Sequence, residues 1–245
     1  MESFFRLREH STTPRTEIMA GFATFLTMVY IVVVNPNIMA AAGIDQGASF
    51  VATCLAAAIG SALMGLLANY PIALAPGMGL NAYFAFAVVG GMHIPWQVAL
   101  GAVFLSGLIF LAVSVLRIRE WLINTIPLSL KLGIAAGIGF FLGIIGLQGM
   151  GLVVANPATM VGLGHVAEPK VLLSCLGFLL IAGLVARNVP GGIIIGILVT
   201  ALLGIPFGLT TFHGVVSLPP SLAPTFLQLD IPGAIGLGVA GMLFP

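Results

Sequence analysis

Long apolar runs, separated by short stretches that contain proline or charged residues, follow one another along most of the chain. A helix needs about 20 apolar residues to cross the hydrocarbon core of a bilayer, and several runs approach this length. Thr13 can cap the first helix, with Pro14 in its first turn and Glu17 near the positive end of its dipole. The pattern predicts seven membrane crossings, at about 18–34, 49–68, 71–89, 96–115, 130–147, 171–185 and 191–205.

The third run is interrupted by residues that do not continue a helix well, namely Pro76, Gly77 and Gly79. Non-helical backbone at membrane depth is tolerated only where protein or a water-filled cavity satisfies its amide groups. A helix that restarts after Gly77 would direct its free N–H groups and the positive end of its dipole into the bilayer. Many secondary transporters build their substrate site in this way, so the break indicates a transporter.

An eighth apolar run begins near Ile231, but it contains only about 14 residues before Pro245 and is too short to cross a bilayer. No charged residue or histidine lies deep within a predicted crossing, whereas a carrier coupled to protons or sodium usually has an intramembrane carboxylate. We therefore expect the sequence to be the first half of a longer carrier. The carboxylates at the ends of crossings or in loops are Glu17, Asp45, Glu120, Glu168 and Asp230.

The composition also indicates a membrane protein, because 60% of the residues are hydrophobic and only 6% are charged. The net charge of +1 comes without a clustered basic face, so nucleic acid is not an expected partner. Cys54 and Cys175 lie inside apolar runs and are interpreted as small buried residues, since two ligands do not make a zinc site. With no nucleophile and base paired at membrane depth, we expect no enzyme, no metal and no cofactor.

The loop charges predict the orientation, because lysine and arginine concentrate on the cytoplasmic side of membrane proteins. With seven crossings and a cytoplasmic N-terminus, only Lys170 would lie outside. One mistaken crossing would scramble this split, so the charges favour this count and a cytoplasmic N-terminus in the cytoplasmic (inner or plasma) membrane. The basic residues placed inside are Arg6, Arg8, Arg15, Arg117, Arg119, Lys131 and Arg187.

Three segments resemble a known family: 16–31 (TEIMAGFATFLTMVYI), 34–36 (VNP) and 75–84 (APGMGLNAYF). Through them the whole chain resembles the adenine/guanine/hypoxanthine permeases, a branch of the nucleobase–cation symporter (nucleobase/ascorbate transporter) superfamily. The resemblance implies an all-α polytopic membrane protein with fourteen segments in two inverted repeats of seven. It also implies a third segment made of a short strand and a half-helix, with the purine bound between the third and tenth segments.

The same resemblance implies how the chain is divided. Segments one to four belong to a core domain and segments five to seven to a gate domain, and the substrate crosses as the core rocks against the gate. The family's acidic residues on the eighth and tenth segments, which hold the base and couple protons, have no counterpart here. The implied parts are a cytoplasmic tail at 1–16, first-repeat core at 17–116, first-repeat gate at 117–212, and a connection with the start of segment eight at 213–245.

Asn81 is the leading candidate for a substrate contact, because it matches the family's asparagine and lies one turn into the half-helix. Its amide offers two donors and an acceptor to the donors and acceptors of a purine edge. The alternative is an asparagine that bonds locally to the broken backbone. Gly77, Met78 and Gly79 would offer backbone N–H groups, and the two glycines would let a flat ring approach. Their alternative role is to break the helix for packing.

Thr24, Thr27 and Tyr30 on the first crossing are spaced by three and share one helix face. Thr27 or Tyr30 could therefore line a cavity opposite Asn81, although such hydroxyls more often bond to the carbonyl four residues back or across helices. Phe84 could stack on the base, and its more common alternative role is packing.

Two further patterns are interpreted as structural. Asn35–Pro36 is expected to kink or end the first crossing rather than to bind a ligand. Pairs of glycines four residues apart predict close helix packing, in the gate domain or in a homodimer. These pairs are Gly133 and Gly137, Gly139 and Gly143, and Gly192 and Gly196.

Together these features predict a secondary active transporter that imports a purine nucleobase (adenine, guanine or hypoxanthine) with protons, by alternating access of core and gate. An anion carrier of the same architecture is an open alternative, because a half-helix N-terminus also suits an anion. A non-transporting membrane remnant or scaffold is the alternative from another class. The expected partners are the purine, the coupling protons and the lipid bilayer, with a homodimer as a further candidate.

Overall fold

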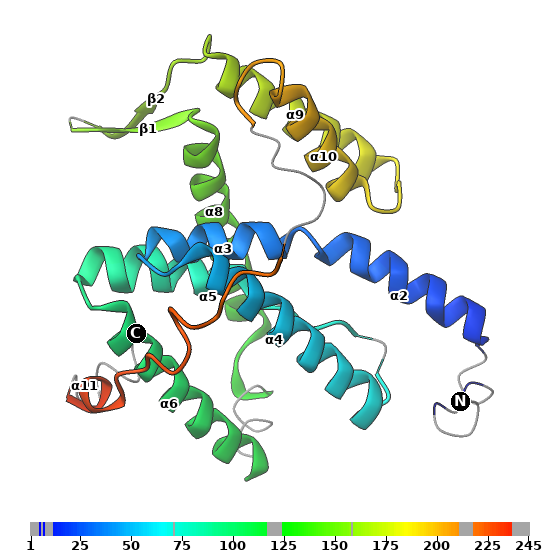
Figure 1. Cartoon of the computed structure of the whole chain (residues 1–245), viewed down its shortest axis with the longest axis vertical. Coiled ribbons are helices and arrows are strands. Elements are labelled where there is room, and N and C mark those ends of the chain that lie inside the picture. The colour runs from blue at the N-terminus through cyan, green and yellow to red at the C-terminus, as the bar shows by residue number, and fades with distance from the viewer. Residues whose placement is uncertain are drawn as a thin grey trace. The chain divides into compact units, whose positions relative to one another are not determined.

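The computed structural model describes residues 5, 7, 12–70, 72–116, 124–157, 159–210 and 218–236. Most of the tail at 1–16, the start of the gate at 117–123 and the eighth run beyond 236 lie outside the described residues. The described part is mostly helical, with one pair of strands (Figure 1). The elements are α2 (Pro14–Met28), α3 (Ile31–Ala41), α4 (Gln46–Leu67), α5 (Met78–Ala82), the π-helix η1 (Tyr83–Gly91), α6 (Trp96–Val115), α8 (Leu128–Met150), β1 (Val153–Asn156), β2 (Met160–Leu163), α9 (Pro169–Ala186), α10 (Gly192–Gly204) and α11 (Ile231–Gly236).

The apolar helices coincide with the predicted crossings. Two of them, Met78–Gly91 and Gly192–Gly204, are shorter than a full crossing and lie where the third and seventh were predicted. At 13 residues α10 falls short of the bilayer thickness, so a full seventh crossing is not confirmed. Within the described residues, five helices are long and apolar enough to span a bilayer: Pro14–Ala41, Gln46–Leu67, Trp96–Val115, Leu128–Met150 and Pro169–Ala186.

The first crossing is interrupted at a different place from the one predicted. The helix breaks at Val29–Tyr30, and α3 then continues through Asn35 and Pro36. The crossing was predicted to kink or end at these two residues; it does not end there, and a kink at Pro36 stays a prediction. The break is a tight turn in which Val32 and Val33 donate backbone hydrogen bonds to the third residue back, at 3.1 Å each. These bonds provide partners for backbone groups between the two helices. The helix continues through Pro36 because proline removes only one backbone donor.

The chain folds as two compact units, each of which is described separately. The first unit draws on Met1–Val34, Thr53–Pro76 and Ile144–Leu218. The second unit draws on Asn35–Ala52, Gly77–Gly143 and Pro219–Pro245. The division into core and gate domains stays a prediction.

In the first unit α9 and α10 form an antiparallel pair that packs closely through glycines (Figure 1). An added Cβ atom at Gly196 would collide with Ile181, and one at Gly177 would collide with Thr200. Gly192 is also tightly packed, so this predicted glycine pair does mediate close helix packing. The glycines of the other two predicted pairs, all on α8, meet no neighbouring atom within 4 Å: Gly133, Gly137, Gly139 and Gly143.

Between α8 and α9 the chain forms an antiparallel hairpin that was not predicted from the sequence. Its register pairs Val153 with Leu163 at one end and Asn156 with Met160 at the other. The backbone N–H of Gly164 closes the hairpin with a 2.9 Å bond to the carbonyl of Leu152. The outer edges of two strands expose backbone polar groups, which are not stable in hydrocarbon. The hairpin therefore belongs at the membrane surface.

In the second unit α11 packs on α6 through Asp230. The backbone N–H of Asp230 donates to the carbonyl of Gln97 at 3.1 Å, and its carboxylate accepts from the backbone N–H of Gly233 at 2.9 Å. Gly101 permits this approach, because an added Cβ atom there would lie 2.6 Å from the Asp230 carbonyl oxygen. Asp230 therefore caps α11, which is a structural role.

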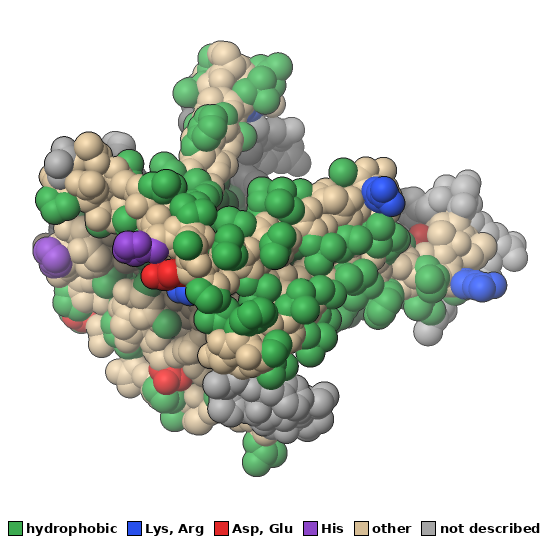
Figure 2. Space-filling model, turned by 90° about the horizontal axis from the view of Figure 1, so that it is seen from above, with side chains coloured by type: hydrophobic (Ala, Val, Ile, Leu, Met, Phe, Trp, Pro, Cys, Tyr) green, Lys and Arg blue, Asp and Glu red, His purple; other side chains and the backbone are tan. Residues whose placement is uncertain are grey.

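Large apolar side chains are exposed along the helices, and Figure 2 shows a face that they cover with few charged groups. None of the 23 residues of α8 is buried, and no more than 17% of the apolar window of any spanning helix is buried inside the protein. Exposure of this much apolar surface is unfavourable in water and favourable in hydrocarbon. The five spanning helices of the described residues therefore make the chain an integral membrane protein.

Candidate functional site

The broken third segment has the predicted restart. Residues 72–77 form neither helix nor strand, and α5 begins at Met78 with extended backbone at Gly77 (φ −77°, ψ 111°). No side chain caps this helix start, so its first N–H groups are available to another partner. The expected short strand is not formed, because a strand requires a neighbouring strand and none pairs with residues 72–77 in the described part of the chain.

Ser61 on α4 anchors the irregular residues that precede this restart. Its hydroxyl accepts a hydrogen bond from the backbone N–H of Leu74 at 2.9 Å and donates one to the carbonyl of the same residue at 3.2 Å. One side chain thus satisfies both backbone groups of Leu74, which backbone at membrane depth requires. All of these atoms belong to the first unit.

The half-helix widens soon after it starts. Residues 83–91 form the π-helix η1, which ends with a bond from the backbone N–H of Met92 to the carbonyl of Ala87, five residues earlier. π-helical turns are rare and frequently occur at functional sites. The π-helix could not be predicted from the sequence, because the apolar run YFAFAVVGG suits an α-helix and a π-helix equally.

Asn81 bonds to a distant side chain rather than to the nearby backbone. Its Nδ2 donates to Oδ1 of Asn35 on α3 at 2.5 Å, across 46 positions of sequence and within the second unit. Asn35 is 6% exposed, whereas Asn81 is half-buried. The two asparagines thus join the first segment to the half-helix of the third. Asn35 was predicted only to shape the helix; its amide within an apolar run was the signal that could have identified it as a partner of Asn81.

The two glycines of the break differ in what surrounds them. An added Cβ atom at Gly77 would meet nothing within 4 Å, while one at Gly79 would lie 2.8 Å from Cγ2 of Ile138 on α8. Packing alone therefore accounts for Gly79, but it does not account for Gly77. Met78, between them, is half-buried.

The remaining candidate residues are Thr27, Tyr30 and Phe84. The hydroxyl of Thr27 donates to the carbonyl of Thr24 at 2.7 Å, a bond within its own helix to the third residue back instead of the fourth that the alternative named. Tyr30 lies in the turn between α2 and α3, and Phe84 on η1 is 7% exposed. Thr27 and Tyr30 belong to the first unit and Asn81 to the second, so a cavity that they share stays a prediction. Stacking of Phe84 on a base stays a prediction as well.

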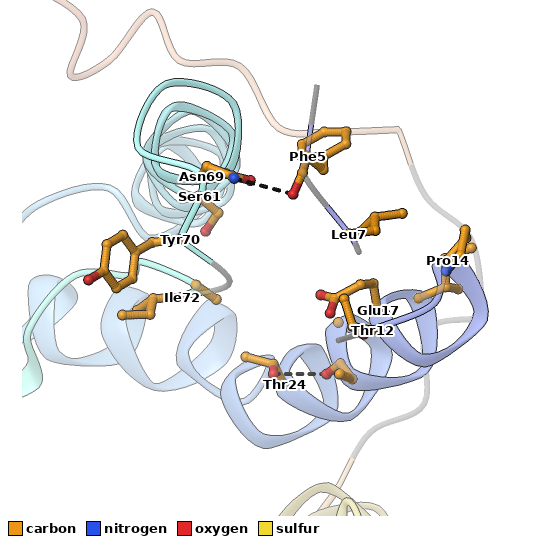
Figure 3. A pocket seen from close by; sticks show the side chains of 15 residues that line it. Phe5, Leu7, Thr12, Pro14, Glu17, Thr24, Ser61, Asn69, Tyr70 and Ile72 are labelled. Carbon is orange, nitrogen blue, oxygen red and sulfur yellow. Dashed lines mark hydrogen bonds between the residues drawn. The ribbon is translucent and has the colours of Figure 1, made fainter. Parts of the chain in front are cut away.

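A pocket of about 630 Å³ lies in the first unit and includes none of the predicted site residues. Figure 3 shows residues of the N-terminal segment and α2 on one side, facing the end of α4 and the residues that follow it. The carboxylate of Glu17 points into the space, and the side-chain amide of Asn69 donates to the carbonyl of Phe5 at 3.3 Å (Figure 3). The lining is otherwise mainly apolar, so this pocket offers few groups to recognise a polar base.

Comparison with known proteins gives one family. A model described as a permease family matches residues 15–243. The chain is similar to the adenine permease AdeP of Escherichia coli, with 51% identity over 244 residues that cover 100% of the chain and 55% of that protein. It is also similar to the guanine/hypoxanthine permease PbuG of Bacillus subtilis, with 50% identity over 238 residues that cover 93% of the chain and 54% of that protein. The chain thus spans about half the length of these curated relatives.

Proposed function

This chain belongs to the permease family, in the branch of the adenine and guanine/hypoxanthine permeases, and on that premise we propose that it forms half of a carrier that imports purine nucleobases. The coverage of the relatives agrees with the expectation of half a carrier. Import would follow from rocking of the core at 17–116 against the gate at 117–212.

The observation that carries this proposal is the amide of Asn81 at the start of a broken helix. A purine is a flat ring whose edge alternates hydrogen-bond donors and acceptors, and a carboxamide can match one of each. The uncapped backbone N–H groups after Gly77 add donors that point the same way along the helix axis. Gly77, Met78 and Gly79 would therefore face the ring, with Phe84 against it and Thr27 and Tyr30 lining the opposite wall.

Proton coupling requires a group that binds the proton, and within the membrane this group is usually a carboxylate. The carboxylates of this sequence lie at helix ends or in loops. We therefore place the coupling groups in the part of the carrier that these 245 residues do not include. The basic loops favour an N-terminus in the cytoplasm, and the open glycines of α8 are available for contacts with that other part or with a second copy.

Uptake of radiolabelled adenine, guanine and hypoxanthine in a host without purine transporters tests the function. We expect the protein encoded by the complete reading frame to take up at least one base, with mutual competition, because its site recognises the shared purine edge. The 245-residue chain alone is expected to give none, since it holds half of the site. Uptake of inorganic anions but no base would favour the anion carrier. No uptake of either kind, despite normal membrane levels, would favour a remnant or scaffold.

Gly77→Ala is expected to raise the KM for purine uptake by roughly three- to tenfold at an unchanged membrane level. The backbone angles at Gly77 suit alanine, and the added methyl meets no protein atom within 4 Å, so it would obstruct only a bound ligand. Gly107→Ala on α6 is the matched control, because its surroundings are equally open and it lies on another helix. An unchanged KM for Gly77→Ala would remove this glycine from the site.

A further inference from the structure

The bond between Asn35 and Asn81 has a direction. Asn81 donates through Nδ2, and Asn35 accepts through Oδ1. A carboxamide holds its nitrogen and its oxygen on opposite sides of the same plane, so turning the nitrogen toward Asn35 turns the oxygen of Asn81 away from it. Without an acceptor beside it, the amide of Asn81 could rotate by half a turn, which would exchange the positions of its nitrogen and its oxygen.

The surroundings make this direction costly to reverse. Asn35 is 6% exposed within an apolar helix, where an amide that loses its hydrogen bond keeps the full penalty of its lost hydration. If Asn81 alone rotated, its oxygen would face the oxygen of Asn35, and neither could donate. Reversing the bond therefore requires both amides to rotate together. The observed arrangement therefore leaves the carbonyl oxygen and one N–H of Asn81 for a ligand.

We propose that Asn35 is a positioning residue that sets base selectivity by fixing which end of the Asn81 amide meets the purine. This inference rests on the proposed function. Adenine presents an amino donor at the position where guanine and hypoxanthine present a carbonyl acceptor. A fixed amide distinguishes these two groups, whereas an amide that rotates freely accepts both. Asn35 thus acts on the substrate through Asn81 and need not contact the base.

A purely structural role for Asn35 makes a different prediction. A bond that only joined α3 to α5 would, when lost, reduce the amount of folded carrier and lower Vmax equally for every base. It would leave the ratio of the KM values for adenine and hypoxanthine unchanged. The ratio therefore separates the two roles.

The test uses the protein of the complete reading frame, with KM and Vmax measured for radiolabelled adenine and hypoxanthine. Asn35→Leu keeps the size of the side chain and removes the acceptor. We expect it to raise the KM for the preferred base by about tenfold and to bring the ratio of the two KM values at least about threefold closer to one.

Asn37→Leu is the matched control, because Asn37 lies on the same helix and accepts a hydrogen bond from Gln46 instead of Asn81. It is expected to behave as the wild type. If Asn35→Leu does not reach the membrane, Asn35→Gln, which displaces the acceptor by one methylene, is expected to shift the ratio in the same direction. If the wild type takes up purines and the Asn35 variant that reaches the membrane has an unchanged ratio of the two KM values, this inference is overturned and the proposed function is not. Absence of purine uptake by the wild type would overturn the proposed function and this inference with it.

Discussion

Replacing Asn81 by alanine is expected to abolish purine uptake by the complete carrier, with a loss of at least roughly hundredfold in Vmax/KM. The substitution removes the donor and the acceptor that the base would use, and it removes the hydrogen bond from Asn81 to the buried oxygen of Asn35. A site built on hydrogen bonds loses more than one bond's net contribution when its polar groups are left unpaired.

The measurement is the initial rate of uptake of each radiolabelled base, normalised to the amount of carrier in isolated membranes. That amount is expected to stay near the wild-type level, because Asn81 is only half-buried and alanine is compatible with a helix. Asn37→Ala serves as the control for loss of an asparagine on an apolar helix. Retained uptake with an unchanged KM would exclude Asn81 from the substrate site.

The second large effect concerns stability. Gly196→Ala is expected to destabilise the carrier by about 1–3 kcal/mol, because the added Cβ atom would overlap the side chain of Ile181 and push α10 away from α9. The neighbouring contact of Gly177 with Thr200 restricts the adjustment that the helix pair can make. The midpoint of thermal unfolding in detergent is therefore expected to fall by several degrees.

Gly183→Ala on α9 is the matched control, because an added Cβ atom there meets nothing within 4 Å. Alanine favours a helix over glycine, so this variant should unfold at the wild-type temperature or slightly above it. Equal midpoints for the two variants would show that the close approach of α9 and α10 is not needed for stability.

The positions of the helices could be predicted because a helix that crosses a bilayer needs a long apolar run, and interruptions of that run are unfavourable. The apolar runs predicted the bounds of α4, α6 and α8 to within a few residues. The restart after Gly77 could be predicted for the same reason, since proline and glycine at membrane depth have few structural explanations. In each case the signal is local to the segment.

The features that escaped prediction depend on partners or on small differences in backbone energy. The bond between Asn81 and Asn35 joins residues 46 positions apart, so only the folded chain brings them together. The break at Val29–Tyr30 contains neither glycine nor proline, and the apolar run of η1 has no residue that distinguishes two helix types. The hairpin forms because residues that favour strands, such as Val153 and Val161, pair across a turn with Leu163 and Ala155, and such residues are a weaker signal than a long apolar run.

The hairpin between α8 and α9 also offers a way to determine the sidedness of the membrane protein by chemical labelling. Its strands lie between two helices of spanning length, and their exposed edges require water. The native thiols, Cys54 and Cys175, lie within α4 and α9 instead. Leu163 on the hairpin is exposed, so a cysteine introduced there would present its thiol to water, unlike the two native cysteines. A membrane-impermeant maleimide would then label this thiol from one side of the membrane only.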